Sequence, residues 1–365
     1  MHTLMRSFKY ACVAMLLGPG LSLATATAAN ALSDAKEPGS LIIFPYFTTG
    51  TVTPDSAVQP KTEIHIGVTC PVGVTCPEGE PVKLEAHWVC PGSENPSRSF
   101  VCKESNFVLF TTVNGKITVN PNGQSTVGNI PPPPCRHGYL IAWVINTLDQ
   151  PIKFDGLFGD AVVRNSSSAE SAYDGIPVQA ADTDPAHTGN LITTGVNLNT
   201  GEPTLIFDGV APHYTMLTGQ LTGDVKFTNA ATTPGTVDPN TALVFLTVDV
   251  QSNFPNNPTF VPLTFYNARE NPTSTSFNFV CWGAVQITKL NASLTQTAQG
   301  TIEGSFASGQ AVKVQISGIP DGSGPATLLG LVITTESSAP KTIEREYITQ
   351  PFNNSVGIPT AFGFD

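Results

Sequence analysis

Short runs rich in Val, Ile, Thr and Phe, separated by Pro, Gly and Asn, recur along the chain after residue 31. Within runs such as Glu63–Thr69 and Val312–Ile316, apolar residues alternate with more polar ones. This alternation is the period of a strand that buries one face. No amphipathic helical pattern longer than two turns interrupts the series. Short strands with frequent turn residues predict an all-β protein made of antiparallel sandwiches or barrels.

One turn signal is especially strong. Asn114-Gly115 stands between the strand-like runs Asn106–Val113 and Lys116–Val119. Asn-Gly is favoured in two-residue hairpin turns because both positions need a positive φ. The sequence therefore predicts a β-hairpin at this position.

The distribution of strands and polar segments predicts two tandem β-sandwich domains, of immunoglobulin-like or jelly-roll-like type. The first spans residues 32–227 and carries a loop-rich insertion at about 165–223. A small, polar, proline-bearing stretch at 228–241 is the expected linker, and the second sandwich spans 242–365. Phe100-Val101-Cys102 and Phe279-Val280-Cys281 each precede an alternating run, which indicates a diverged duplication. Chance similarity between two β-rich segments is the alternative explanation.

The N-terminus has the order of segments found in a secretory signal peptide. Arg6 and Lys9 precede an apolar stretch from Tyr10 to Leu23, and small residues follow up to Ala31. We expect residues 1–31 to be removed before Leu32. The protein is then secreted or held at the cell surface, with the periplasm or outer envelope as further destinations. An uncleaved anchor is the alternative.

Six cysteines remain after that cleavage, and an even number in an exported chain predicts disulfide bonds. Short-loop closure favours Cys70 with Cys76 and Cys90 with Cys102, which leaves Cys135 for Cys281. Six cysteines allow 15 pairings, so the alternatives stay open. The sequence contains no Cys-x-x-Cys pair of the kind that structural zinc sites use.

Charge and hydropathy exclude several classes of partner. The formal net charge is −11 and no Lys/Arg cluster is present, so nucleic acid is not an expected partner. No apolar run long enough for a transmembrane helix follows the N-terminus. Only 12% of residues are charged, and strand edges that lack Lys favour addition of further strands. Self-assembly, or binding to a cell-surface or glycan partner, is therefore expected.

The densest polar cluster is Asp182-Thr183-Asp184-Pro185-Ala186-His187, with Asp174 upstream. Carboxylates in one turn can supply oxygen ligands to Ca²⁺, so Asp182 and Asp184 are the candidate metal ligands. Asp followed by Pro is also typical of an ordinary turn, which needs no metal. Tyr173, in loop-like surroundings, is an expected exposed aromatic contact beside this cluster. The candidate ligand-binding set is Asp174, Asp182, Asp184, His187 and Tyr173, with calcium as the one cofactor considered.

No motif predicts an enzyme. The sequence lacks a Gly-x-Ser-x-Gly elbow, a zinc-protease pattern and a phosphate-binding Gly-rich loop. A secreted hydrolase would have to use Asp155, Asp160, Asp182 or His187.

Three functions thus remain, in decreasing order of support. The first is an exported, non-enzymatic structural or adhesion protein that acts through strand edges and polar loops. The second is a carbohydrate-binding module or adhesin tip with its site in the loop Gly175–Gly189, with or without Ca²⁺. The third is the hydrolase.

Overall fold

The structure is a computed structural model. It describes residues 36–49, 61–92, 102–164, 170–197, 201–226, 238–249, 258–266, 272–290, 311–317, 319–320, 327–338, 342–349, 352–353 and 357–364. The expected signal peptide at residues 1–31 lies outside these ranges, as does most of the expected linker at 228–241.

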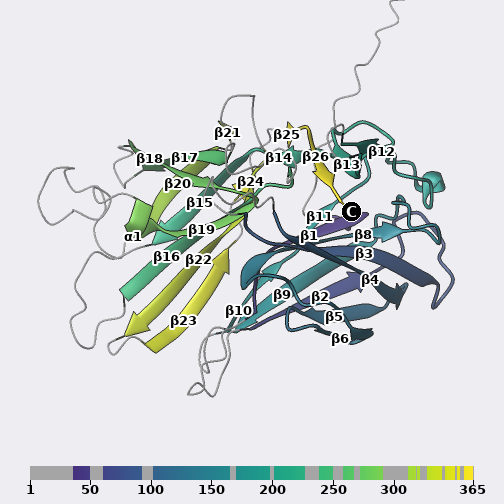
Figure 1. Ribbon diagram of the computed structural model, residues 1–365, viewed down its shortest axis with the longest axis horizontal. Coiled ribbons are helices and arrows are strands. Elements are labelled where there is room, and N and C mark those ends of the chain that lie inside the picture. Colours follow the sequence, from purple (N-terminus) through teal and green to yellow (C-terminus); the bar gives the residue numbers. More distant parts are fainter. Residues whose placement is uncertain are drawn as a thin grey trace, which may run out of the picture.

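The prediction of an all-β protein is confirmed. The paired strands are antiparallel throughout the described residues, and the helical structure among them is one turn of α-helix, α1 (Ile287–Leu290), and one 3-10 turn, η1 (Pro185–His187). Among the described residues no helix has the length and apolar character needed to cross a membrane. The sheets gather into two groups that lie side by side along the longest axis of the molecule (Figure 1).

The first group is an N-terminal sheet pair. One sheet has the order β11 (Ile176–Val178), β1 (Leu41–Thr48), β8 (His137–Ile145), β3 (Pro81–Val89) and β4 (Glu104–Thr112). The other has the order β10 (Glu170–Asp174), β9 (Leu157–Arg164), β2 (Lys61–Val68), β5 (Lys116–Asn120), β6 (Gln124–Ser125) and β7 (Gly128–Asn129).

Burial along these strands follows the residue pattern. In β2 the side chains of Ile64 and Ile66 are fully buried, whereas His65 between them is half-buried on the outer face. Strand β8 differs, because every residue from Gly138 to Ile145 is buried. A strand that is buried on both faces must be covered on its outer side as well. Phe362, near the C-terminus, supplies part of that cover and packs on Trp143 with ring centroids 6.0 Å apart.

The second group is a C-terminal sheet pair. One sheet has the order β18 (Pro272–Phe279), β17 (Thr259–Tyr266), β20 (Ala311–Ser317), β15 (Gln220–Lys226) and β24 (Phe352–Asn353), with β21 (Ile319–Pro320) beside β17. The other has the order β19 (Trp282–Gln286), β16 (Asp238–Leu246), β22 (Leu329–Ser338) and β23 (Thr342–Thr349). Phe245, Phe265 and Phe279 are buried in the apolar core of this pair.

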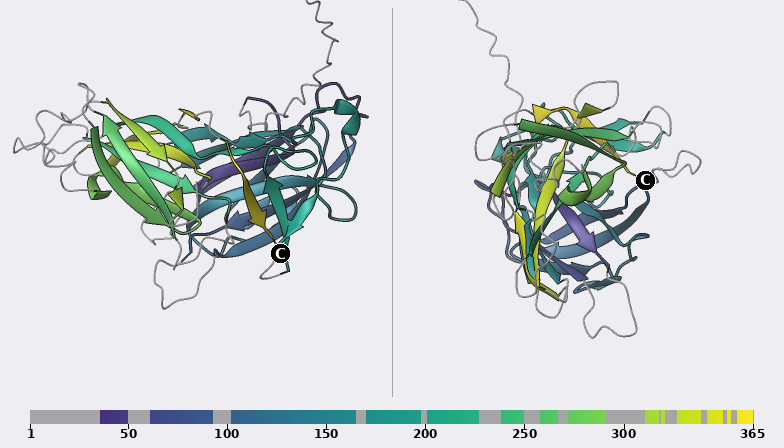
Figure 2. Two further views of the ribbon diagram at one scale, coloured as in Figure 1. Left: turned by 90° about the horizontal axis from the view of Figure 1, so that it is seen from above. Right: turned by 90° about the vertical axis from the view of Figure 1, so that its left-hand side faces the viewer.

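The strand pairing crosses the expected segment boundaries. Strand β15 lies within 32–227 but pairs with β20 of the C-terminal sheet pair, and β16 begins inside the expected linker. In the other direction, β25 (Gly357–Ile358) pairs with β14 (Leu217–Thr218), and β26 (Thr360–Gly363) pairs with β13 (Pro203–Phe207) beside β12 (Thr194–Val196). The C-terminal segment therefore runs back along the insertion to the N-terminal sheet pair (Figure 2).

Direct contacts join the two sheet pairs. The indole N–H of Trp282 donates to the carbonyl oxygen of Pro45 at 2.9 Å, and the Tyr139 hydroxyl donates to the carbonyl oxygen of Thr247 at 3.2 Å. The ring of Trp282 also stacks on Tyr46. One continuous apolar cluster therefore extends from the N-terminal sheet pair to β16, β19 and β22 of the C-terminal pair, which also has a second core of its own.

Three disulfides are present, but two of the favoured pairings are wrong. Cys70–Cys76 forms as expected, whereas Cys90 bonds Cys135 and Cys102 bonds Cys281. Cys90 follows β3 and Cys135 precedes β8, and these strands are neighbours in one sheet, so their ends meet. Closing a loop of 45 residues rather than 12 costs only about 1 kcal/mol more in chain entropy. Strand pairing outweighs that difference.

The hairpin prediction at Asn114-Gly115 is also wrong in part. A turn forms, with Asn114 at φ 62° and the Gly115 N–H donating to the Thr112 carbonyl oxygen at 2.8 Å. The flanking strands then separate, because β4 pairs with β3 in one sheet and β5 pairs with β2 in the other. The turn is a corner between facing sheets.

Candidate binding cavity

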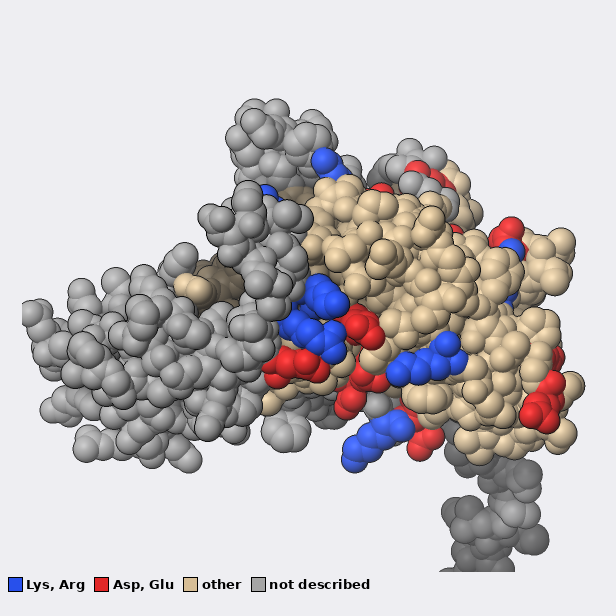
Figure 3. Space-filling view, turned by 90° about the horizontal axis from the view of Figure 1, so that it is seen from below, with Lys and Arg blue, Asp and Glu red and all other residues tan. Residues whose placement is uncertain are grey.

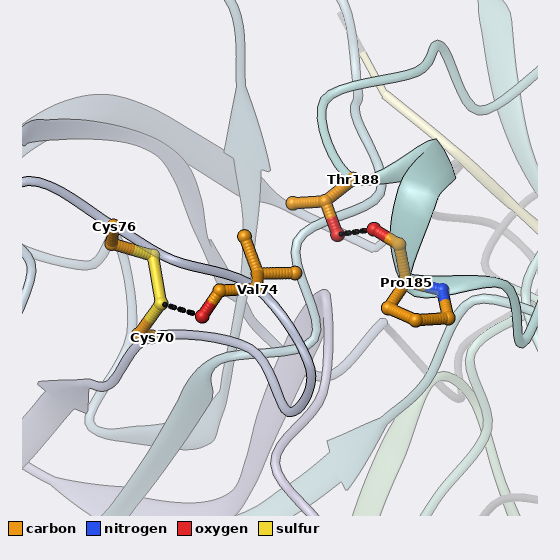
Figure 4. The surroundings of a disulfide bond; sticks show 5 residues. All are labelled: Cys70, Val74, Cys76, Pro185 and Thr188. Carbon is orange, nitrogen blue, oxygen red and sulfur yellow. Dashed lines mark hydrogen bonds between the residues drawn. A yellow bond between two sulfur atoms is a disulfide. The ribbon is translucent and has the colours of Figure 1, made fainter.

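A disulfide-closed loop follows β2. Cys70 and Cys76 are bonded, and within the loop the Val74 N–H donates to the Pro71 carbonyl oxygen at 3.1 Å. The carbonyl oxygen of Val74 lies 3.2 Å from the sulfur of Cys70 (Figure 4). Val72, within this turn, is 80% exposed. The loop is therefore held in shape while it presents an apolar side chain to solvent.

The loop that contains η1 is held by its own aspartates. The carboxylate of Asp182 accepts from the Asp184 N–H at 3.0 Å, and that of Asp184 accepts from the Ala186 N–H at 2.9 Å. The Thr188 hydroxyl donates to the Pro185 carbonyl oxygen at 2.9 Å (Figure 4). These are the local bonds by which Asp and Pro build turns. The interpretation as a turn thus accounts for both aspartates.

Two nitrogen-bearing side chains contact the same turn. Nδ1 of His187 lies 2.7 Å from Asp182, and Nζ of Lys153 lies 3.6 Å from the other Asp182 oxygen and donates to the Asp184 carbonyl oxygen. Lys153 is almost fully buried, with 4% of its surface exposed. The Asp184 N–H and the His187 ring lower the pKa of Asp182. Lys153 therefore holds this loop against the N-terminal sheet pair.

A cavity of about 650 Å³ lies between these two loops. Its size is in the range of about 300–1,000 Å³ that is typical of ligand pockets. Its apolar wall comes from the ends of β3 and β8 and from the segment that follows, with Val82, Ile145, Ile152 and Phe154. Its charged side chains are Glu80, Lys83 and Asp184. Pro185 and Thr188 line it and also a second cavity of about 190 Å³ on the other side of the disulfide loop.

Calcium finds little support at Asp182 and Asp184. No group of three or more His, Cys, Asp or Glu side chains suited to a metal ion occurs in the described part of the chain. The space a cation would use beside Asp182 is taken by the Lys153 ammonium and the His187 ring. Calcium at this turn therefore stays a prediction without a ligand set.

The remaining candidate ligand residues lie elsewhere. Tyr173 is buried in β10, with 5% of its surface exposed, and its hydroxyl donates to the Tyr46 carbonyl oxygen. The expectation that Tyr173 is exposed is wrong, because alternation along β10 turns it to the core and Asp174 outward. Asp174 stands opposite Asp160 of β9 on the outer face of the sheet.

The four carboxyl and imidazole groups considered for hydrolysis are divided among separate surroundings. Asp155 accepts from the Ser40 hydroxyl at 2.7 Å and from the Ala180 N–H at 2.9 Å, and burial raises the pKa of its carboxyl group. Asp160 instead faces His65, at 3.0 Å. Asp182 and His187 are engaged in the η1 turn. Each of these groups has a structural partner that explains its position.

Sequence reasoning missed the residues that shape the cavity most. Ile152 and Phe154 line the cavity, and Lys153 between them holds the η1 loop and lines the second cavity. All three follow β8 in a segment without a recognisable motif. The one usable signal was the close spacing of Cys70 and Cys76, which indicated a tight disulfide loop but no neighbour for it.

No family model matches this chain, and no curated protein matches it. Among solved structures, it is similar to the viral chemokine binding protein R17 encoded by rodent gammaherpesvirus Peru. The identity is 11%, the match covers 86% of this chain and 87% of that chain, and the TM-score is 0.16. A TM-score this low does not establish a shared fold.

Proposed function

We propose that this chain is an exported, non-catalytic recognition protein of the adhesive or structural class. It binds a protein partner at the cavity between the Cys70–Cys76 loop and the η1 loop. Three disulfides support an oxidising compartment such as the cell exterior. The basic, apolar and small segments at residues 1–31 support export.

The observation that carries the proposal is a set of exposed apolar side chains on segments next to cavity-lining residues, here called the rim. Val72, Leu148 and Leu191 are 80%, 75% and 50% exposed. Leu148 sits in the turn that connects Ile145 to the following segment, and Leu191 is bridged to Ile152, so both are attached to cavity-lining residues. Exposed apolar side chains around a pocket with few charges are characteristic of protein interfaces.

The rim is also rigid. In the turn that carries Leu148, the Asn146 side chain accepts from the Leu148 N–H at 2.8 Å and from the Gln150 N–H at 3.0 Å. Lys83 in the cavity wall is paired with Asp149 of the same turn. Loops ordered in advance lose little conformational entropy on binding, which favours affinity.

The carbohydrate alternative at the loop Gly175–Gly189 lacks an aromatic platform at this cavity. The aromatic side chain that lines it is Phe154, which is 8% exposed. A sugar ring needs an accessible aromatic face for stacking. A protein side chain that enters the apolar wall fits this cavity better.

Site-specific photo-crosslinking tests the proposal. A photoreactive amino acid is placed at Leu148, at Val72 and, as control, at Val127, which is 47% exposed on the β6–β7 turn away from the cavity. We expect the same partner protein to be captured from producing cells at the first two positions but not at Val127. Leu191→Glu should abolish that capture. Equal capture at all three positions, or capture that survives Leu191→Glu, would overturn the proposal.

A further inference from the structure

We propose a saccharide-binding site on the outer face of the N-terminal sheet that contains β9, β2 and β5, centred on the ring of Phe158. This site is separate from the cavity at the disulfide loop and is inferred from different residues.

The first observation is an aromatic side chain laid over a glycine. Phe158 of β9 is 50% exposed and stands directly opposite Gly67 of β2. A Cβ built on Gly67 would lie 2.5 Å from the Phe158 Cζ, so the ring occupies the space above the glycine. Packing of an aromatic ring over a strand glycine protects the backbone. The Phe158 side chain nevertheless stays half exposed to solvent.

The second observation is a hollow beside that ring. It has a volume of about 570 Å³, and Phe158, His65, Asp160, Asn114 and Lys116 line it. Gly67 separates Phe158 from Lys116 across three neighbouring strands, because both pair with it in register. The hollow is therefore bordered by the Phe158 ring, which covers Gly67, and by the Lys116 side chain on the next strand.

The third observation is the fixed polar row next to the ring. Asp160 and His65 are cross-strand neighbours, with Nδ1 of His65 3.0 Å from one oxygen of Asp160. Nε2 of His65 lies 3.1 Å from Glu63. Asp160 and Glu63 thus hold the imidazole from its two ring nitrogens. The other oxygen of Asp160 has no hydrogen-bond partner among the described residues. That oxygen can accept from a ligand hydroxyl.

These groups match the chemistry of a neutral sugar ring. The C–H face of a pyranose packs on an aromatic ring, and its hydroxyls bond to acceptors and donors at the edge. Asp160 supplies an acceptor, and Asn114 and Lys116 supply donors. Acidic and basic side chains lie next to one another on the surface seen from below, among many uncharged residues (Figure 3). Such a surface does not select for one sign of charge, which favours a neutral saccharide over an anionic or a cationic ligand.

The test measures binding of the full mature chain to a panel of neutral gluco-, galacto- and manno-configured oligosaccharides. The panel is screened first on an array. Saturation-transfer NMR then gives the affinities of the oligosaccharides that bind. We expect Phe158→Ala to weaken binding about tenfold or more, and Asp160→Asn to weaken it as well. Phe110→Ala is the matched control, because Phe110 is 59% exposed on β4 of the other sheet. The Phe110→Ala variant should bind the oligosaccharides like the unchanged protein.

Phe158→Leu guards against loss of folding, since it keeps an apolar cover over Gly67 but removes the aromatic face. We expect it to retain the circular dichroism of the unchanged protein and to bind as weakly as Phe158→Ala. The proposal is overturned if no neutral saccharide binds, or if Phe158→Leu and Phe110→Ala bind equally well. Neither result affects the crosslinking experiment at Leu148, so the two proposals fail independently.

Discussion

The indole N–H of Trp282 donates to the carbonyl oxygen of Pro45 at 2.9 Å, across 237 residues of sequence. Trp282 belongs to the C-terminal sheet pair and Pro45 to β1, and both groups are buried. The bond thus joins the two sheet pairs at their shared core.

We expect Trp282→Phe to destabilise the protein by about 1–3 kcal/mol, because a buried carbonyl oxygen loses its donor while most of the ring packing remains. Chemical denaturation followed by circular dichroism measures the change. A midpoint equal to that of the unchanged protein would mean that water satisfies Pro45 in the variant.

The Cys102–Cys281 disulfide should contribute more stability than Cys70–Cys76. Their sequence separations are 179 and 6. In the chain-entropy model the long loop is worth about 5 kcal/mol and the short one about 2 kcal/mol. Paired Cys→Ser variants, compared by urea unfolding, test this ranking. A larger loss from the Cys70/Cys76 pair would contradict it.

His87 should make the stability depend on pH. Its ring is fully buried, and burial alone would lower its pKa, but the hydrogen bond with Glu104 at 3.2 Å and the nearby carboxylate of Glu85 at 3.6 Å outweigh burial and raise it above 6.5. A raised pKa in the folded state stabilises below the unfolded pKa, and this contribution is lost as pH rises through the folded value. We expect His87→Gln to be most destabilising at mildly acidic pH. Urea unfolding from about pH 5 to pH 9 tests this.

His137 supplies a control of opposite sign. Partial desolvation of its ring, together with the charge of Arg136, lowers the pKa of His137. The unfolded chain then binds a proton more readily, so His137 costs stability as pH falls below 6.5. The difference in free energy of unfolding between His137→Gln and the unchanged protein should therefore change with pH in the direction opposite to that for His87→Gln. The same direction for both variants would contradict these assignments.

Gly138→Ala should destabilise by about 1–3 kcal/mol through overpacking. A Cβ at this position of β8 would lie 2.1 Å from the Val89 carbonyl oxygen, which is part of the sheet backbone. Gly67→Ala is the comparison, since its Cβ meets the end of the Phe158 ring, which can rotate away. Thermal unfolding should show the larger loss for Gly138→Ala. Equal losses of thermal stability would mean that β8 and β2 accommodate the added methyl group equally well.

Local periodicity was enough to predict the strands, and its failures have physical causes. Ile64 and Ile66 face the core, as the alternation along Glu63–Thr69 predicts. Tyr173 was placed in a loop because its neighbours are polar, yet it lies in β10 with its hydroxyl bonded to Tyr46. A strand at the edge of a sheet carries many polar residues, so sequence composition resembles that of a loop there.

The candidate site was predictable only in part. The turn at Asp182 and Asp184 follows from local bonding, which the sequence encodes. That the turn faces the Cys70–Cys76 loop depends on Lys153 and on the order of strands between them. Phe158 carried no signal, because its role depends on a glycine in a neighbouring strand 91 positions earlier.

The sequence by itself determined an antiparallel β protein with disulfides, because alternation and turn residues act over a few positions. Tertiary structure decided that Cys102 meets Cys281, that β26 returns to pair with β13, and that Phe158 covers Gly67. Contacts of this kind depend on which distant strands become neighbours. Loop-closure entropy changes so slowly with length that the sequence distance between partners does little to select among them.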